Sequence, residues 1–227
     1  MANLLTFYGT ADKHEREAFL SLTQRANVPA WRQHYSDFLP GWFGMYLGLE
    51  QTSSAIRAYE PQFVPGLLQT REVARAVIRS GNPHASDDDI ERRVALRMTR
   101  QEVLTQPQTP HLWAVIDEAA LLRLDGPLTM RAQIEHLIEM AERPNITIQA
   151  IPIYSSAQVA VGGPFSILSF SDPDLPDVAY LEQLTSAFYL YNSQDVDHYL
   201  MLMGQLRIHA KSPTETTEFL GGILKDT

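Results

Sequence analysis

The sequence predicts an α+β protein with helices first, then a mainly antiparallel sheet of four to six strands, and helices at the end. Hydrophobic residues make up 44% of the chain and charged residues 20%, which is ordinary for a globular domain. Up to Arg143-Pro144 most segments have helical periodicity and end at helix stop signals. After that point come four short runs rich in β-branched and aromatic residues, namely ITIQAIPI, GPFSILSF, DVAYLEQ and SAFYLY.

The amino-terminal region reads as helical and aromatic. We expect a helix over residues 14–27 and a largely helical segment over 31–56 that breaks at Pro40-Gly41. Large rings are concentrated in the second segment: Trp31, Tyr35, Phe38, Trp42, Phe43 and Tyr46. So many large rings in a short segment are usually buried, which favours a helical cap packed on the core. The alternative is a dimer surface. We therefore divide the chain into a helical extension (1–55) and an α+β domain (56–227).

The middle and the end of the chain give a clear series of elements. A Ser-Gly-Asn-Pro sequence closes one helix, and three aspartates occupy the first turn of the next, where the helix dipole favours acids. Asp117 is placed to cap a short helix after a strand that is apolar on both faces. The expected strands are 56–60 and 111–116, and the expected helices are 66–79, 86–105, 128–142, 195–210 and 213–224.

Composition and missing motifs exclude several function classes. The net charge of −9 makes the chain a poor candidate for gripping nucleic-acid phosphates. Cysteine is absent, so disulfides, thiolate nucleophiles and cysteine metal sites are excluded. The sequence contains no GxGxxG, GxxxxGK[ST], GxSxG or HExxH motif, and its seven histidines are scattered, so we expect neither a metal nor a cofactor. Without a signal peptide or an apolar run of about 18 residues, we expect a cytoplasmic protein that does not span a membrane.

Polar residues interrupt the apolar stripe of the helix expected over 86–105. Arg97 and Gln101 fall within the stripe at 100° per residue. Arg97 lacks an acidic residue one turn earlier, because that position is Arg93, so it should point toward the core or a cleft. A buried guanidinium has to be paired.

Three carboxylates at strand ends are candidate partners for Arg97. Asp117 and Glu118 follow the LWAVI strand, and Glu182 ends VAYLE. One interpretation is a core ion pair that ties a helix to the sheet. The other is a polar pocket at the sheet edge, in which Arg97 and Gln101 recognise a ligand. For Asp117 alone, the role of helix N-cap is favoured.

The stretch IRAYEPQFVPGLLQT must form a stiff loop. Pro61 and Pro65 fix φ at two points, and Gly66 frees the following turn. The loop can be a rigid corner with Phe63 as its plug. It can also leave Tyr59, Gln69 and Thr70 near the cleft, and Tyr59 and Gln69 are therefore candidate ligand-binding residues.

Several blocks resemble one known family. They are YEPQFVPGLLQTREVARAVI, RMTRQEVL, WAVIDEAALLR, NITIQAIP, GPFSILSF and VAYLE, in this order along nearly the whole chain. The family is the C-terminal domain of unknown function in Xre-type helix-turn-helix regulators of actinobacteria, often called antitoxin-like regulators. VPGLLQT and R-x-x-R-Q are its most specific blocks. The chain departs from the family at YSSAQVAVGGPF, where a loop with glycine and histidine is common.

The resemblance implies a regulatory domain that binds a small protein partner or a small molecule. DNA would be contacted only through a helix-turn-helix module that this chain lacks, and LLTFYGTADKHEREAFLSL looks like the segment that normally follows that module. The family's characteristic polar positions fall here on Gln69, Thr70, Arg97, Arg100, Gln101, Asp117, Glu118 and Glu182. Of these, we expect Thr70 and Arg100 to be plain surface.

Two functions from different classes stay open. The first is a sensor that binds a small protein partner or a metabolite without turnover, with a groove of apolar walls and few polar anchors. The second is an enzyme of secondary metabolism, such as a cyclase or a group-transfer enzyme. In that case Glu118 or Glu182 would act as general acid or base, with a pKa set by burial and by Arg97.

Overall fold

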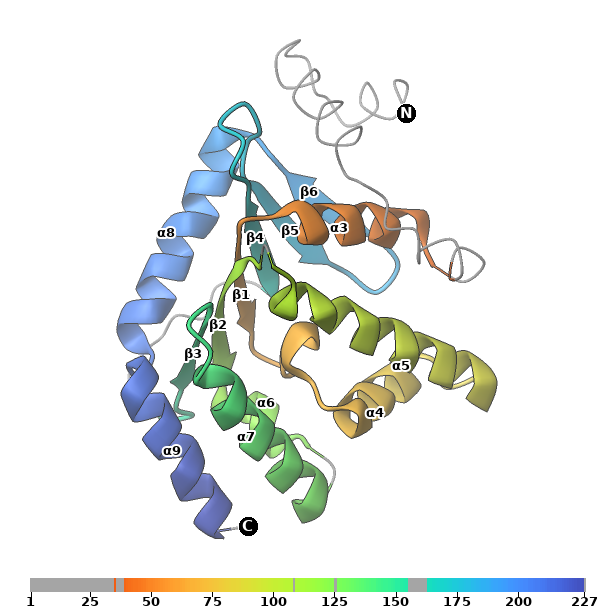
Figure 1. The fold of residues 1–227 in the computed structure, drawn as a ribbon, viewed down its shortest axis with the longest axis vertical. Coiled ribbons are helices and arrows are strands. Elements are labelled where there is room, and N and C mark those ends of the chain that lie inside the picture. Colours follow the sequence, from red (N-terminus) through yellow and green to blue (C-terminus); the bar gives the residue numbers. More distant parts are fainter. Residues whose placement is uncertain (1–34, 36–38, 108, 125, 155–162, 227) are drawn as a thin grey trace.

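A computed structural model describes residue 35 and residues 39–107, 109–124, 126–154 and 163–226. Six strands in these residues form one mixed sheet of order β3-β2-β1-β4-β5-β6, with helices on both faces (Figure 1). The strands are β1 (Ala55–Glu60), β2 (His111–Asp117), β3 (Ile146–Ile151), β4 (Phe165–Ser169), β5 (Val178–Glu182) and β6 (Ala187–Leu190). The α-helices are α3 (Gly41–Thr52), α4 (Arg71–Gly81), α5 (Asp87–Gln101), α6 (Glu118–Leu122), α7 (Pro127–Ala141), α8 (Ser193–His209) and α9 (Pro213–Asp226). Two 3₁₀ helices, η2 (Gly66–Leu68) and η3 (Glu102–Thr105), complete this part of the chain, and the predicted α+β class is confirmed.

The sheet is mixed, with three antiparallel and two parallel pairs among the described strands. Among the described strands, β1 pairs with β4, β4 with β5, and β5 with β6 in antiparallel ladders. The pairs β1–β2 and β2–β3 are parallel, a feature that the sequence does not predict. Helices connect the strands of both parallel pairs, and a helical crossover returns the chain to the same end of the sheet.

The two faces of the sheet have separate cores, because alternate residues of a strand point to opposite sides. The larger core lies under α3, η2, α6, α7 and α9, and we call this side the helical face. Ile56, Leu112, Ile148, Leu168 and Val178 are among its buried strand residues. On the other side, Tyr59, Val115, Ile151, Phe165 and Ile167 pack under Met203 and Leu206 of α8.

Helix α3 packs its rings on the larger core. Tyr46 is buried there, and Trp42 and Phe43 are partly buried against the same cluster. The Tyr189 hydroxyl of β6 donates a hydrogen bond to the Trp42 carbonyl at 2.6 Å. The expected packing of the aromatic segment on the core is therefore confirmed for α3. The helix expected over 14–27, together with Trp31 and Phe38, lies outside the described residues, and the boundary at residue 55 stays a prediction.

One helix begins later than expected. The sequence pattern predicts a continuous helix over 66–79, whereas the chain forms the short η2, passes through extended backbone at Gln69 and Thr70, and starts α4 at Arg71. The Thr70 hydroxyl caps α4 by accepting a hydrogen bond from the Val73 amide at 3.4 Å. None of the helices in the described residues is long and apolar enough to span a bilayer.

Candidate functional site

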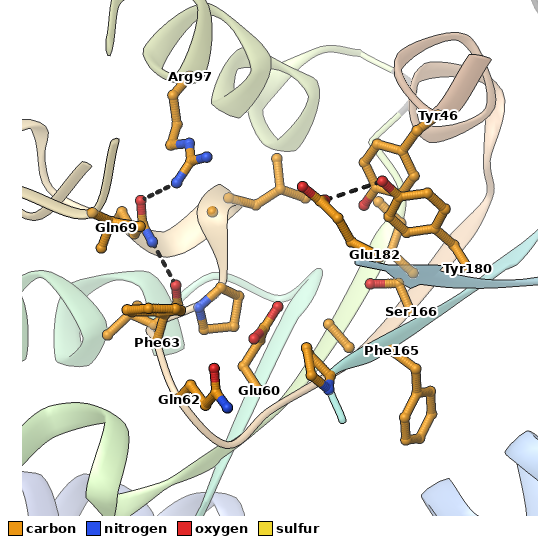
Figure 2. Close-up of a pocket in the computed structure, with 18 of the residues that line it drawn as sticks. Tyr46, Glu60, Gln62, Phe63, Gln69, Arg97, Phe165, Ser166, Tyr180 and Glu182 are labelled. Carbon is orange, nitrogen blue, oxygen red and sulfur yellow. Dashed lines mark hydrogen bonds between the residues drawn. The ribbon is translucent and has the colours of Figure 1, made fainter. Parts of the chain in front are cut away.

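A pocket of about 630 Å³ opens between the helical face of the sheet and the segment that contains η2 (Figure 2). Strands β1, β4 and β5 form its floor, and α3 and α5 contribute to its walls. Its charged lining residues are Glu60, Glu182, Arg97 and Arg100, and rings from Phe43, Tyr46, Phe63 and Tyr180 surround them. A concave site with apolar walls and a few charged groups is the usual form of a small-molecule site.

The wall made by residues 64–70 is held in place by three glutamine side chains. Gln101 of α5 donates to the carbonyls of Gly66 and Gln69, at 3.0 and 2.8 Å. Gln133 of α7, fully buried, donates to the Leu68 carbonyl at 2.7 Å and accepts from the Thr70 amide at 2.8 Å.

The third glutamine is Gln69 itself, whose amide donates to the Val64 carbonyl at 2.7 Å. The backbone of Gln69 is extended, which ends η2 and interrupts the helix expected from Gly66. The stiff loop predicted from Pro61 and Pro65 is thus a fixed wall of the pocket, bound through its own backbone groups.

Arg97 presents a guanidinium to the pocket. Its Nη1 donates to Gln69 Oε1 at 2.7 Å, and within the part of the chain that the structure describes it has no carboxylate within 4.0 Å. Burial and the neighbouring Arg100 lower the pKa of Arg97 to about 10, against the opposing effect of Glu182 and Glu60. Arg97 therefore keeps its positive charge at neutral pH.

Arg100 forms the buried ion pair of this region. Its Nε and Nη2 donate to the two carboxylate oxygens of Glu50 on α3, at 3.0 and 2.8 Å. The side chains are 8% and 3% exposed, and the rings of Phe43 and Tyr46 lie 5.1 and 5.5 Å from the guanidinium carbon. The prediction that Arg100 is plain surface was wrong. The residues around Arg100 do not reveal this ion pair, because its partner Glu50 lies fifty positions earlier in the sequence.

Two glutamates lie on the floor of the pocket. The Tyr180 hydroxyl donates to Glu182 Oε2 at 3.0 Å (Figure 2). Burial, and then the neighbouring Glu182, raise the pKa of Glu60 to about 8, although Arg97 acts in the opposite direction. Glu60 is not predicted as a site residue from the sequence, because it ends a strand just before Pro61, a position typical of a solvated strand end. The alternation of Ile56, Ala58 and Glu60 was the signal that places it on the buried face.

The structure brings together some of the predicted site residues. Gln69, Arg97 and Glu182 line the pocket, and Gln101 supports its wall from behind. Tyr59 points to the opposite face of the sheet, where it packs with Phe165 under α8.

Asp117 and Glu118 lie at the carboxyl end of β2 and do not line the pocket. Asp117 Oδ1 accepts from the Ala119 amide at 2.9 Å, which confirms its role as the N-cap of α6. Glu118 Oε2 accepts from the Ile153 amide at 2.8 Å, so it holds the end of β3 in place. Neither residue forms the ion pair with Arg97 that the sequence pattern suggests, because the Asp117 carboxylate caps α6 and the Glu118 carboxylate accepts from the Ile153 amide.

The clamp on residues 64–70 yields a first prediction. Gln101→Leu should lower the free energy of unfolding by about 1–2 kcal/mol, because two half-buried carbonyls lose their donor. Urea unfolding followed by circular dichroism measures this change. Gln106→Leu, at an exposed position after η3, is the control. Equal stability of the two variants would contradict a clamping role for Gln101.

Within the described residues, no group of three or more His, Asp or Glu side chains is arranged to hold a metal ion. The pocket offers two carboxylates, the Arg97 guanidinium, the Arg100 guanidinium that is paired with Glu50, and aromatic rings. These groups suit an organic molecule with polar and apolar parts.

Comparison with known proteins assigns the chain to a family. Residues 43–222 match a family described as a domain of unknown function, DUF5753. Searches of curated proteins and of solved structures each gave no match. The matched range begins within α3 and includes the pocket-lining residues and all six strands of the sheet. The chain therefore belongs to the DUF5753 family of domains of unknown function.

Proposed function

We propose that the chain is the sensor part of an Xre-type transcriptional regulator, and that the pocket binds a small molecule. The observation that carries the proposal is the Arg97 guanidinium, which faces a cavity of about 630 Å³ with a neutral amide as its hydrogen-bond partner. Side chains on a rigid wall reduce the entropy lost on binding, and the clamped residues 64–70 supply such a wall.

The regulatory part of the proposal rests on the sequence blocks that resemble the sensor half of these regulators. The net charge of −9 supports a division of labour in which this domain does not grip DNA itself. The ligand would act by stabilising one state of the domain over another, and a DNA-binding module would read that state. A small protein partner remains the other class of ligand for this function.

A pocket-filling variant tests the small-molecule proposal. Ala58 lies on the pocket floor, so the larger side chain of Ala58→Leu should extend into the cavity and occupy part of it. We expect native mass spectrometry, after exposure to a metabolite library, to show a small-molecule adduct on the wild-type protein and none on Ala58→Leu. Ala76→Leu, on an exposed side of α4, should retain the adduct. Adducts that persist in Ala58→Leu, or no adduct on the wild type, would count against the pocket as the sensing site.

One observation favours an enzyme as the second candidate. A carboxylic acid with a pKa of about 8, like Glu60, can donate or accept a proton near neutral pH, as general acid–base catalysis requires. Glu182, one of the two catalytic candidates from the sequence, lines the same pocket, whereas Glu118 does not. Chemical conversion of the bound molecule, lost in Glu60→Gln while binding persists, would favour the enzyme over the sensor.

A further inference from the structure

The pocket brings two glutamates from separate strands to one place on the sheet. Strand β4 lies between β1 and β5, and both neighbours run antiparallel to it. Glu60 and Glu182 each lie two residues beyond a residue that is aligned with Ser166. Both therefore flank Pro164 on the helical face, and Figure 2 shows their carboxylates directed into the pocket.

The spacing between these glutamates leaves room for one polar group. Neighbouring strands lie roughly 4.8 Å apart, so the Cα atoms of Glu60 and Glu182 are on the order of 10 Å apart. Because side chains of a strand stand roughly perpendicular to the sheet, an ammonium group above Pro164 can lie between the two carboxylates. Pro164 lies between them on the floor, and its ring offers no hydrogen-bond donor.

The described residues leave both carboxylates without a direct cation. Glu182 accepts one hydrogen bond, from the Tyr180 hydroxyl, and Glu60 accepts none from a described side chain. No arginine or lysine nitrogen of the described residues lies within 4.0 Å of either carboxylate. Arg97 acts on both over a longer distance, while its hydrogen bond goes to Gln69.

With both glutamates ionised, the pocket has one more negative charge than positive charge. Arg100 and Glu50 neutralise each other, which leaves Arg97 against the two carboxylates. The protein alone meets this deficit by keeping a proton on Glu60, whose pKa burial and Glu182 raise to about 8. A cation from outside can replace that proton and restore the balance with both carboxylates ionised.

The rest of the lining favours an apolar body attached to the cation. Rings from Phe43, Tyr46, Phe63 and Tyr180 line the same cavity. Aromatic faces also attract organic cations. A volume of about 630 Å³ admits a molecule with one or more rings.

We infer that the pocket recognises an organic cation, a protonated amine on a ring-containing body, with its ammonium group between the carboxylates of Glu60 and Glu182. This inference rests on the proposed function, because it names the chemical class of the molecule that the pocket senses.

Three indoles that differ in one group test the inference. Isothermal titration calorimetry at pH 7 compares tryptamine, indole-3-ethanol and indole-3-propionate. Tryptamine should bind about tenfold tighter than the other two, because it alone makes charge-assisted hydrogen bonds with the carboxylates. Titrations in phosphate and in Tris, which differ in ionisation enthalpy, should show release of about one proton per tryptamine bound.

Matched variants identify the groups involved. Glu60→Gln should abolish the proton release and weaken tryptamine binding about tenfold. Glu118→Gln, which removes a carboxylate outside the pocket, should leave both unchanged. Tryptamine binding no tighter than that of the alcohol, or unaffected by Glu60→Gln, overturns the inference. Preferred binding of the propionate, lost in Arg97→Met, also overturns it but leaves the sensor proposal standing.

Discussion

Arg100→Met is expected to lower the free energy of unfolding by about 3–5 kcal/mol, which for a chain of this size corresponds to a fall in Tm of roughly 6–20 °C. The Glu50 side chain is only 3% exposed, and the variant removes the guanidinium that donates to both of its carboxylate oxygens. A buried carboxylate that loses its partner keeps its full desolvation cost. Urea unfolding followed by circular dichroism measures the loss, since urea does not screen charges.

A double variant separates a lost contact from an orphaned charge. Glu50→Leu combined with Arg100→Met removes both charges, and we expect it to recover stability to within about 1–2 kcal/mol of the wild type. Arg131→Met is the control, because Arg131 and Glu135 form an ion pair whose side chains are 51% and 54% exposed. Such a surface pair contributes about 0–1 kcal/mol. A double variant as unstable as Arg100→Met would show that packing, and not charge, holds α3 to α5.

The α+β class and most element boundaries could be predicted, because they depend on local signals. Strand β2 and helix α6 follow from an apolar run and the capping side chain of Asp117. The start of α4 could not be predicted, because it depends on contacts with distant residues. From two other helices, Gln101 binds the Gln69 carbonyl and Gln133 binds the Thr70 amide, and a continuous helix would use these groups for its own hydrogen bonds.

The candidate site was predictable only where a residue broke a periodic pattern. Arg97 interrupts an apolar stripe, and it lines the pocket. Glu60 continues the alternation of Ile56 and Ala58, but the strands beside it become visible only in three dimensions, as does the contact of Arg100 with Glu50. Glu118 was selected for its place after β2, yet its carboxylate binds the Ile153 amide and does not line the pocket.

As pH rises from about 5 to 9, the free energy of unfolding of the wild type should fall more steeply than that of Glu60→Gln. Glu60 has a pKa of about 8 in the folded protein and an ordinary value of 4.5. Between these values the folded state holds a proton that the unfolded state has released, so each rise in pH favours unfolding. The stability that this proton contributes is fully present below pH 4.5 and is lost progressively up to about pH 8. Above that pH, Glu60 adds no further pH dependence.

The size of this effect distinguishes a buried carboxylate from a solvated one. The full shift corresponds to an upper limit of roughly 5 kcal/mol, and water entering the pocket reduces it to on the order of 2–3 kcal/mol. Glu182 and Arg97 face Glu60 and set this value together with burial. Urea unfolding at several pH values should give profiles that converge near pH 5 and separate near pH 8, where Glu60→Gln is the more stable protein. Glu118→Gln provides the reference for removal of a carboxylate outside the pocket, and parallel profiles for wild type and Glu60→Gln would contradict a proton held on Glu60.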